Sequence, residues 1–101
     1  MIIYNITINV NWSIHDDWLQ WLKQEYIPTI LQTGCFSESK ILRLLEIDDE
    51  EGPTYAIQFH AAAVAAYEVY INQYAAPINQ QALEKWGDQI IAFRSVMEVL
   101  H

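Results

Sequence analysis

The sequence predicts an α+β domain in which a four-stranded antiparallel sheet carries two helices on one face. Residues 4–10 alternate apolar and polar side chains with a period of two, which is typical of a strand with one buried face. Residues 14–22 and 61–74 carry apolar side chains at helical spacing, which indicates two helices that pack on a sheet. The other strands are predicted at 40–48, 54–60 and 89–100.

Composition limits the class of protein. The 101 residues carry a formal net charge of −8, 52% of them are apolar and 18% are charged. This length predicts one domain spanning 1–101, and the apolar fraction argues against intrinsic disorder. With only 5 Lys and Arg residues the chain neutralises few phosphates, so we expect no nucleic-acid partner.

The same sequence predicts a location in the cytoplasm. The longest apolar run, Ala61–Tyr67, is far shorter than a bilayer span, so we expect no membrane partner. No Lys or Arg precedes Ile2, so the basic region of a signal peptide is missing. The one cysteine, Cys35, excludes an internal disulfide and is expected to be a small packed side chain.

The first helix is predicted to begin at a capping box formed by Ser13 and Asp16. Its apolar stripe consists of Ile14, Trp18, Trp21 and Leu22. Pro28 is expected to end or kink this helix near residue 27, since proline has no N–H to donate. Gly34 then offers a left-handed stop.

Residues 40–48 and 54–60 are predicted to form a hairpin of two strands, each about eight residues long. The acidic turn 49–53 joins them and ends in Gly52-Pro53.

A second helix is predicted at 61–74, and a short helical segment beginning near Pro77 and stopping at Gly87 should cover its outer side. Its core face is predicted to consist of Ala62, Ala65, Ala66, Val69 and Tyr70, while Val64 and Ile71 lie on the side to be covered. The order β-α-β-β-α-β is the ferredoxin-like pattern.

Both faces of the second and fourth strands read as mostly apolar. Two helices cover only one face of a sheet, so the other face of these strands needs cover from elsewhere. The sequence therefore predicts a homodimer in which two sheets pack face to face, with Asn5, Thr7 and Asn9 at or near the interface.

The chain also resembles a known family over essentially its whole length. The similarity lies in Asn9-Val10, Ser13–Leu22, Tyr26-Ile27-Pro28, Leu31–Phe36, Lys40–Leu45, Thr54–Phe59 and Ala92-Phe93-Arg94. These segments are similar to the uncharacterised bacterial domain of unknown function DUF4286, which looks like a branch of the dimeric α+β barrel superfamily. The resemblance implies a dimeric ferredoxin-like fold but no reaction, because that superfamily contains cofactor-free monooxygenases, isomerases, haem-handling enzymes and proteins without an assigned activity.

Three titratable residues are candidate ligand-binding or catalytic groups. Glu25 lies three residues after Leu22, within the apolar stripe, where desolvation would make a carboxylate a general base. The simpler interpretation, which we favour, is that Glu25 lies at a solvent-exposed helix end or pairs with Lys23 or an arginine. For His15 the simpler interpretation is a surface residue that packs beside Leu19. For His60 it is a histidine at a strand end whose ring nitrogens have hydrogen-bond partners. Either ring could also act as a general base.

Arg43 and Arg94 each interrupt an otherwise apolar strand, and a buried arginine needs a partner. Glu46 and Glu98 are the nearest acidic residues in sequence, but neither is well placed on the same strand. The favoured interpretation is structural pairing across the dimer, and the alternative is an anion-binding cavity.

Two functions of different classes follow. The first is a homodimer that binds a small molecule or a protein, and the second is a cofactor-independent monooxygenase or isomerase. We favour the first and leave open whether the chain is an enzyme. A pocket that contains His60, Arg94 or Glu25 would favour the enzyme. No metal is expected because His15, Asp16 and Asp17 diverge around a helix, and no motif predicts a cofactor.

Overall fold

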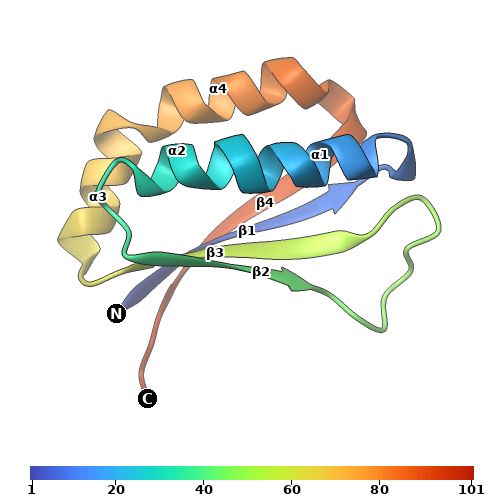
Figure 1. Cartoon of the computed structure of the whole chain (residues 1–101). Coiled ribbons are helices and arrows are strands. Elements are labelled where there is room, and N and C mark those ends of the chain that lie inside the picture. Colours follow the sequence, from blue (N-terminus) through green and yellow to red (C-terminus); the bar gives the residue numbers. More distant parts are fainter.

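The computed structural model describes residues 1–101 and contains one antiparallel sheet under a layer of helices (Figure 1). The strands are β1 (Ile2–Val10), β2 (Glu38–Arg43), β3 (Thr54–Ala61) and β4 (Ile90–Glu98). Their order in the sheet is β2-β3-β1-β4, with β1 bonded to β3 on one side and to β4 on the other. The predicted α+β ferredoxin-like pattern and antiparallel sheet are confirmed. No helix is long and apolar enough to span a bilayer.

The helical layer contains the two predicted helices and, in place of the short segment predicted from Pro77, a third helix of 12 residues. Its first part is a continuous run of η1 (Trp12–Ile14), α1 (His15–Trp21), the π-helical η2 (Leu22–Tyr26) and α2 (Ile27–Leu31). Its second part is divided into α3 (Val64–Gln73) and α4 (Ala75–Trp86), followed by η3 (Gly87–Gln89). Tyr74, with φ of −124°, separates α3 from α4. Because Pro77 has no N–H, it fits the first turn of a new helix and not the interior of a longer one.

The first helix begins differently from the prediction and contains a π turn that was not predicted. Asn11 caps it by accepting a hydrogen bond from the Ser13 backbone N–H at 2.9 Å, while Ser13 lies inside η1. The predicted capping box is therefore wrong. Pro28 does not end the helix either, because the π turn of η2 precedes it, with Ile27 N–H donating to the Leu22 carbonyl five residues back.

The hairpin is shorter than predicted. β2 ends at Arg43, and residues 44–53 form a loop instead of strand plus tight turn. Glu46 takes a left-handed φ of 59°, which breaks the extended run. The loop is fastened at its far end, where Gly52 passes so close to β1 that a Cβ would lie 1.6 Å from the Val10 carbonyl oxygen.

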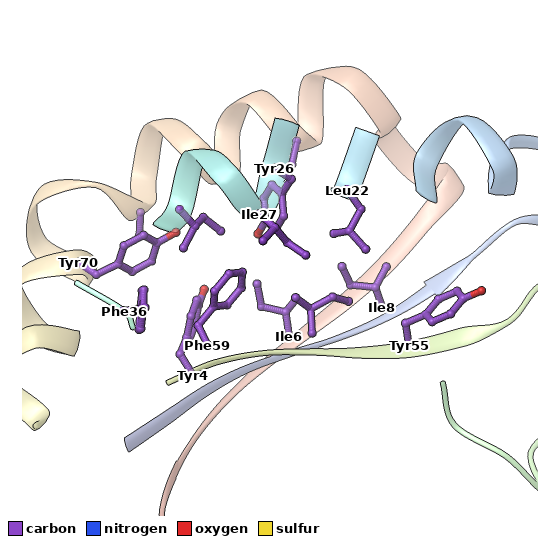
Figure 2. Close-up of a cluster of buried hydrophobic side chains, with 14 of the residues drawn as sticks. Tyr4, Ile6, Ile8, Leu22, Tyr26, Ile27, Phe36, Tyr55, Phe59 and Tyr70 are labelled. Carbon is purple, nitrogen blue, oxygen red and sulfur yellow. The ribbon is translucent and has the colours of Figure 1, made fainter. Parts of the chain in front are cut away.

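The core fills the space between the sheet and the helices (Figure 2). The sheet contributes the alternate residues Ile2, Tyr4, Ile6, Ile8, Val10, Tyr55, Ile57 and Phe59, all of them buried. For Tyr4, Ile6, Ile8 and Val10 the periodicity predicted this. Trp18, Leu22, Tyr26 and Ile30 descend from the first helix, and Tyr70 from α3. The predicted core face of α3 is only partly correct, because Ala66, Tyr67 and Tyr70 turn inward while Ala62, Ala65 and Val69 lie outside the core. Val64 and Ile71 are exposed as well, because α4 continues beyond the end of α3 and does not cover them.

No helix covers the opposite face of the sheet (Figure 1), which we call the open face. The pairing register puts four rows of side chains on it: Glu38-His60-Ile3-Met97, Lys40-Gln58-Asn5-Ser95, Leu42-Ala56-Thr7-Phe93, and Thr54-Asn9-Ile91. The edge strand β4 presents exposed Ile91, Phe93 and Met97, as predicted. On the other edge strand, β2, only Leu42 is apolar beside Glu38 and Lys40, so the prediction of a mostly apolar strand is wrong there. The open face is thus apolar along β4 and largely polar elsewhere.

We expect Trp18→Ala to lower the free energy of unfolding by about 3–5 kcal/mol, because the ring is fully buried and its loss leaves a cavity. Chemical denaturation measures this change. Val64→Ala, at a half-exposed position of α3, is the control and should change stability by no more than about 0.5 kcal/mol. A loss below about 1 kcal/mol for Trp18→Ala would contradict its place in the core.

Candidate functional site

A hollow of about 350 Å³ lies between α4 and β4, at the edge of the helical layer. Its lining residues are Ala76, Asn79, Gln80, Ala82 and Leu83 of α4, followed by Gly87, Ile90, Ala92 and Arg94. The alanine residues and Gly87 leave this space open, whereas residues with larger side chains would fill it. The lining is mostly apolar, with two amides and one guanidinium, a combination that is typical of small-molecule sites.

Arg94 is the one charged residue in this lining. It lies opposite Ile6 in the β1–β4 register, so its side chain projects toward the helices. Nε donates to the Tyr4 hydroxyl at 3.2 Å, and a terminal nitrogen donates to Asn79 Oδ1 at 3.1 Å. No carboxylate lies within ion-pair distance of it. Within the chain its partners are therefore neutral, and Glu98 is not among them.

Behind Arg94, three tyrosine hydroxyl groups lie in the core (Figure 2). Burial raises the pKa of Tyr4, Tyr26 and Tyr70 above the usual range, and the nearby guanidinium offsets only part of this. The Tyr70 hydroxyl is buried without a hydrogen-bond partner. These phenols stay neutral and supply no counter-charge to Arg94. Sequence reasoning placed the aromatic residues in the core and missed this polar cluster.

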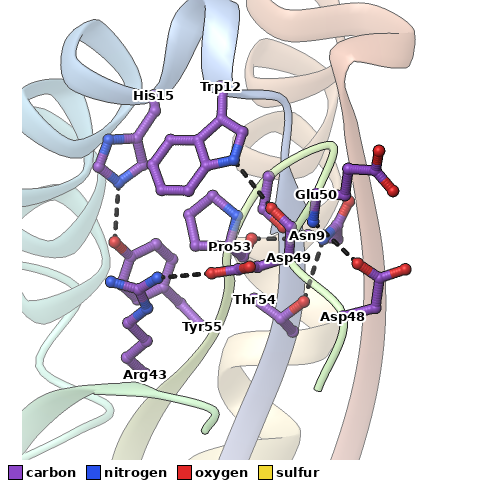
Figure 3. A network of polar contacts seen from close by, with 11 residues as sticks. Asn9, Trp12, His15, Arg43, Asp48, Asp49, Glu50, Pro53, Thr54 and Tyr55 are labelled. Atoms are coloured by element: carbon purple, nitrogen blue, oxygen red, sulfur yellow. Dashed lines mark hydrogen bonds and ion pairs between the residues drawn. The ribbon is translucent and has the colours of Figure 1, made fainter. Parts of the chain in front are cut away.

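His15 belongs to a separate network near the β2–β3 loop (Figure 3). Its Nε2 is hydrogen-bonded to the Tyr55 hydroxyl at 2.7 Å, and its Nδ1 to Asp16 at 3.0 Å. The ring also stacks on the Tyr55 ring, at 5.8 Å between centroids. Through these contacts with Tyr55 the His15 side chain is only 14% exposed.

Arg43 lies in the same region and fastens the loop. It donates to Asp49 at 3.0 Å and lies 6.0 Å from the centre of the Trp12 ring, whose Nε1 donates to the Asp49 carbonyl (Figure 3). Its acidic partner is thus Asp49 and not Glu46. These contacts give Arg43 a structural role within its own chain.

Neither of the two remaining candidates lines the hollow. Glu25 is exposed on the outer side of η2, because the π turn moves Tyr26 into the position that an unbroken α-helix would give Glu25. It lines an open, polar groove of about 530 Å³ beside Trp21 and Lys85. His60 lies on the open face, buried, with Nδ1 3.1 Å from Glu38 but not aligned for a hydrogen bond. The predicted "satisfied" histidine is therefore only partly satisfied.

The five candidate residues therefore do not meet in one site. Only Arg94 lines the hollow, and no histidine, cysteine, aspartate or glutamate accompanies it there. Nowhere do three His, Cys, Asp or Glu side chains come together as a metal site would require.

The family model described as "domain of unknown function (DUF4286)" matches residues 1–100. No curated protein matches the sequence.

Several solved structures share the fold. HapK from Hahella chejuensis is 11% identical with a TM-score of 0.69, covering 99% of this chain and 93% of its own. SnoaB, a cofactor-independent oxygenase from Streptomyces nogalater, is 10% identical with a TM-score of 0.68, covering 99% and 94%. A dimeric ferredoxin-like protein from an uncultured marine organism is 9% identical with a TM-score of 0.65, covering 99% and 95%. At these identities the likeness establishes the fold alone.

The tyrosine cluster should make stability depend on alkaline pH. Since burial raises the pKa of Tyr26 in the folded state, its contribution to stability is complete below about pH 10 and is lost as pH rises toward the folded value. Tyr26→Phe should therefore reduce the fall in unfolding free energy by about 1.4 kcal/mol per pH unit above pH 10. Denaturant titrations at several pH values measure the slope. Tyr74→Phe, at an exposed position, is the control, and equal slopes for the two variants would contradict this assignment.

Proposed function

Because the chain belongs to the DUF4286 family, which brings no activity with it, we propose from its geometry that it is a cytoplasmic homodimer that binds a small molecule. The hollow between α4 and β4 is the observation that carries the ligand part of this proposal. The open face of the sheet is the observation that supports the homodimer.

The dimer is supported by the exposed apolar side chains on the open face. Ile91 is 57% exposed and Phe93 69% exposed in the single chain, and Leu42 and Met97 lie on the same face. Monomeric soluble proteins seldom expose a contiguous apolar patch of more than a few hundred Å². A second copy of the sheet is the economical cover, and the fold neighbour described as a dimeric ferredoxin-like protein agrees with it.

The polar middle of this face shapes the proposed interface. Asn5 donates to Thr7 at 3.0 Å and to Ser95 at 3.3 Å, and Asn9 donates to Thr54 at 3.0 Å. These side chains enter the interface with part of their hydrogen-bonding already satisfied, which lowers the cost of burying them. We propose that the apolar residues of β4, together with Leu42, supply the contact and that this polar middle is paired or hydrated.

The ligand site is proposed within each protomer and not between the sheets. Its apolar walls and its convergent polar groups, Arg94, Asn79 and Gln80, are all supplied by α4 and β4. A hollow of about 350 Å³ lies near the lower end of the roughly 300–1,000 Å³ that small-molecule pockets span.

A cofactor-independent enzyme is the alternative function. Arg94 lies in the hollow, and SnoaB, a fold neighbour, is described as a cofactor-independent oxygenase. The lining offers no general base, however, because the candidate bases His15, Glu25 and His60 all lie elsewhere. The binding function therefore remains the one that we favour.

The dimer predicts a mass in solution of twice the 11.8 kDa chain. Light scattering on the purified chain at micromolar concentration should give this value, since the proposed interface buries at least about 1,200 Å² in total. A monomer under these conditions would refute the proposed assembly.

Two glutamate substitutions should distinguish the faces of the sheet. Phe93→Glu places a charge on the open face and should give a folded monomer, whereas Ile57→Glu buries a charge under the helices and should unfold the chain. Circular dichroism reports folding and light scattering reports mass. A Phe93→Glu variant that stays dimeric would show that this face is not the interface.

A further inference from the structure

We propose that the hollow between α4 and β4 binds a small organic acid with one carboxylate and an apolar body, and that Arg94 receives the carboxylate. The inference rests on the proposed ligand site and names the chemical class of its ligand.

Arg94 has no counter-charge within its own chain. Arg94 uses two of its N–H groups on the neutral Tyr4 hydroxyl and Asn79 amide oxygen, and a guanidinium carries five such donors. In a chain with 13 Asp and Glu residues, no carboxylate lies within ion-pair distance of it. Arg43 shows the contrast, since Asp49 pairs with it at 3.0 Å. Arg94 therefore has free donors and no anion.

The groups that surround the Arg94 guanidinium are neutral. Tyr4 and Tyr26 lie behind it as neutral phenols, since burial raises the pKa of both. The side chains that line the rest of the hollow are uncharged. A carboxylate that enters the hollow would be the first negative charge beside Arg94, and planar carboxylates match the donor geometry of guanidinium groups.

The apolar wall of the hollow indicates what the remainder of the ligand is like. Ala82, Leu83, Ile90 and Ala92 form an apolar wall, against which a polar or highly charged body would lose its hydration. One cation without neighbouring lysines, arginines or a helix N-terminus suits a single charge and not a phosphate or a dicarboxylate. The net charge of −8 also disfavours unspecific binding of anions, so affinity for an acid has to come from the local contact.

The test uses the wild-type protein with two acids and their uncharged isosteres: benzoate, hexanoate, benzamide and hexanamide. Calorimetric titration at pH 7 and constant ionic strength should show saturable binding of at least one acid. The corresponding amide should bind at least tenfold more weakly, because it offers no charge to Arg94. This comparison needs no variant and does not depend on how a mutation affects folding.

A substitution tests the role of Arg94 in the same assay. Asn79→Asp should place a carboxylate beside the guanidinium and weaken binding of the acid at least tenfold. Gln81→Glu is the matched control, because it adds the same charge to the same helix outside the hollow, and it should leave the affinity within about twofold of wild type. Equal effects of the two variants would overturn the inference.

The other outcomes separate this inference from the proposed function. Amides that bind as tightly as their acids would overturn the carboxylate assignment and leave a small-molecule site in the hollow. If none of the four compounds binds to a protein that light scattering shows to be dimeric, the inference fails and the dimer part of the proposed function stands.

Discussion

A single layer of helices covers only one face of the four-stranded sheet, and the rest of the molecule depends on this constraint. β1 lies in the middle, bonded on both sides, and sends alternate side chains to each face. Its helix-facing residues, such as Tyr4 and Ile6, complete the core. Its other residues, such as Asn5 and Thr7, have no covering layer within the chain, so the open face is where we propose that a second copy packs.

The same constraint explains where the hollow lies. α4 reaches over the edge strand β4 with alanines toward it, so the helix and sheet do not close completely there. Arg94 projects into this space from β4 and is held by Tyr4 and Asn79. A charged residue is tolerated at this point because it remains accessible at the edge of the layer, whereas the phenols deeper in the core stay neutral.

The periodic parts of the fold could be predicted from the sequence. The alternation around Ile6 identified the buried face of β1, and the spacing of Trp18 and Leu22 identified the helix that covers it. The alternation around Ile57 separated the two faces of β3 but did not say which one the helices cover. Gly87, with φ of 58°, ends α4 where glycine was expected to stop it. These features depend on local spacing, which one sequence contains in full.

The parts that depend on contacts between distant residues could not be predicted. The π turn before Pro28 was not predicted, although the exposed position of Glu25 agrees with the favoured interpretation of a solvent-exposed helix end. The Asp49 carbonyl accepts a hydrogen bond from the Trp12 indole and its carboxylate accepts one from Arg43, and no periodicity encodes these contacts. Likewise, the partners of Arg94 lie 15 and 90 residues away in sequence. Sequence reasoning therefore found Arg94 but not the hollow that it lines.

Solvent accessibility of isoleucine methyl groups, measured by NMR with a soluble paramagnetic agent, tests most directly the claim that each face of the sheet has its own cover. In the single chain Ile57 is fully buried, Ile71 is 39% exposed on α3 and Ile91 is 57% exposed on the open face. The account predicts that the signal of Ile91 is protected as well as that of Ile57, while that of Ile71 is attenuated. Attenuation of Ile91 at least as strong as that of Ile71 would contradict it.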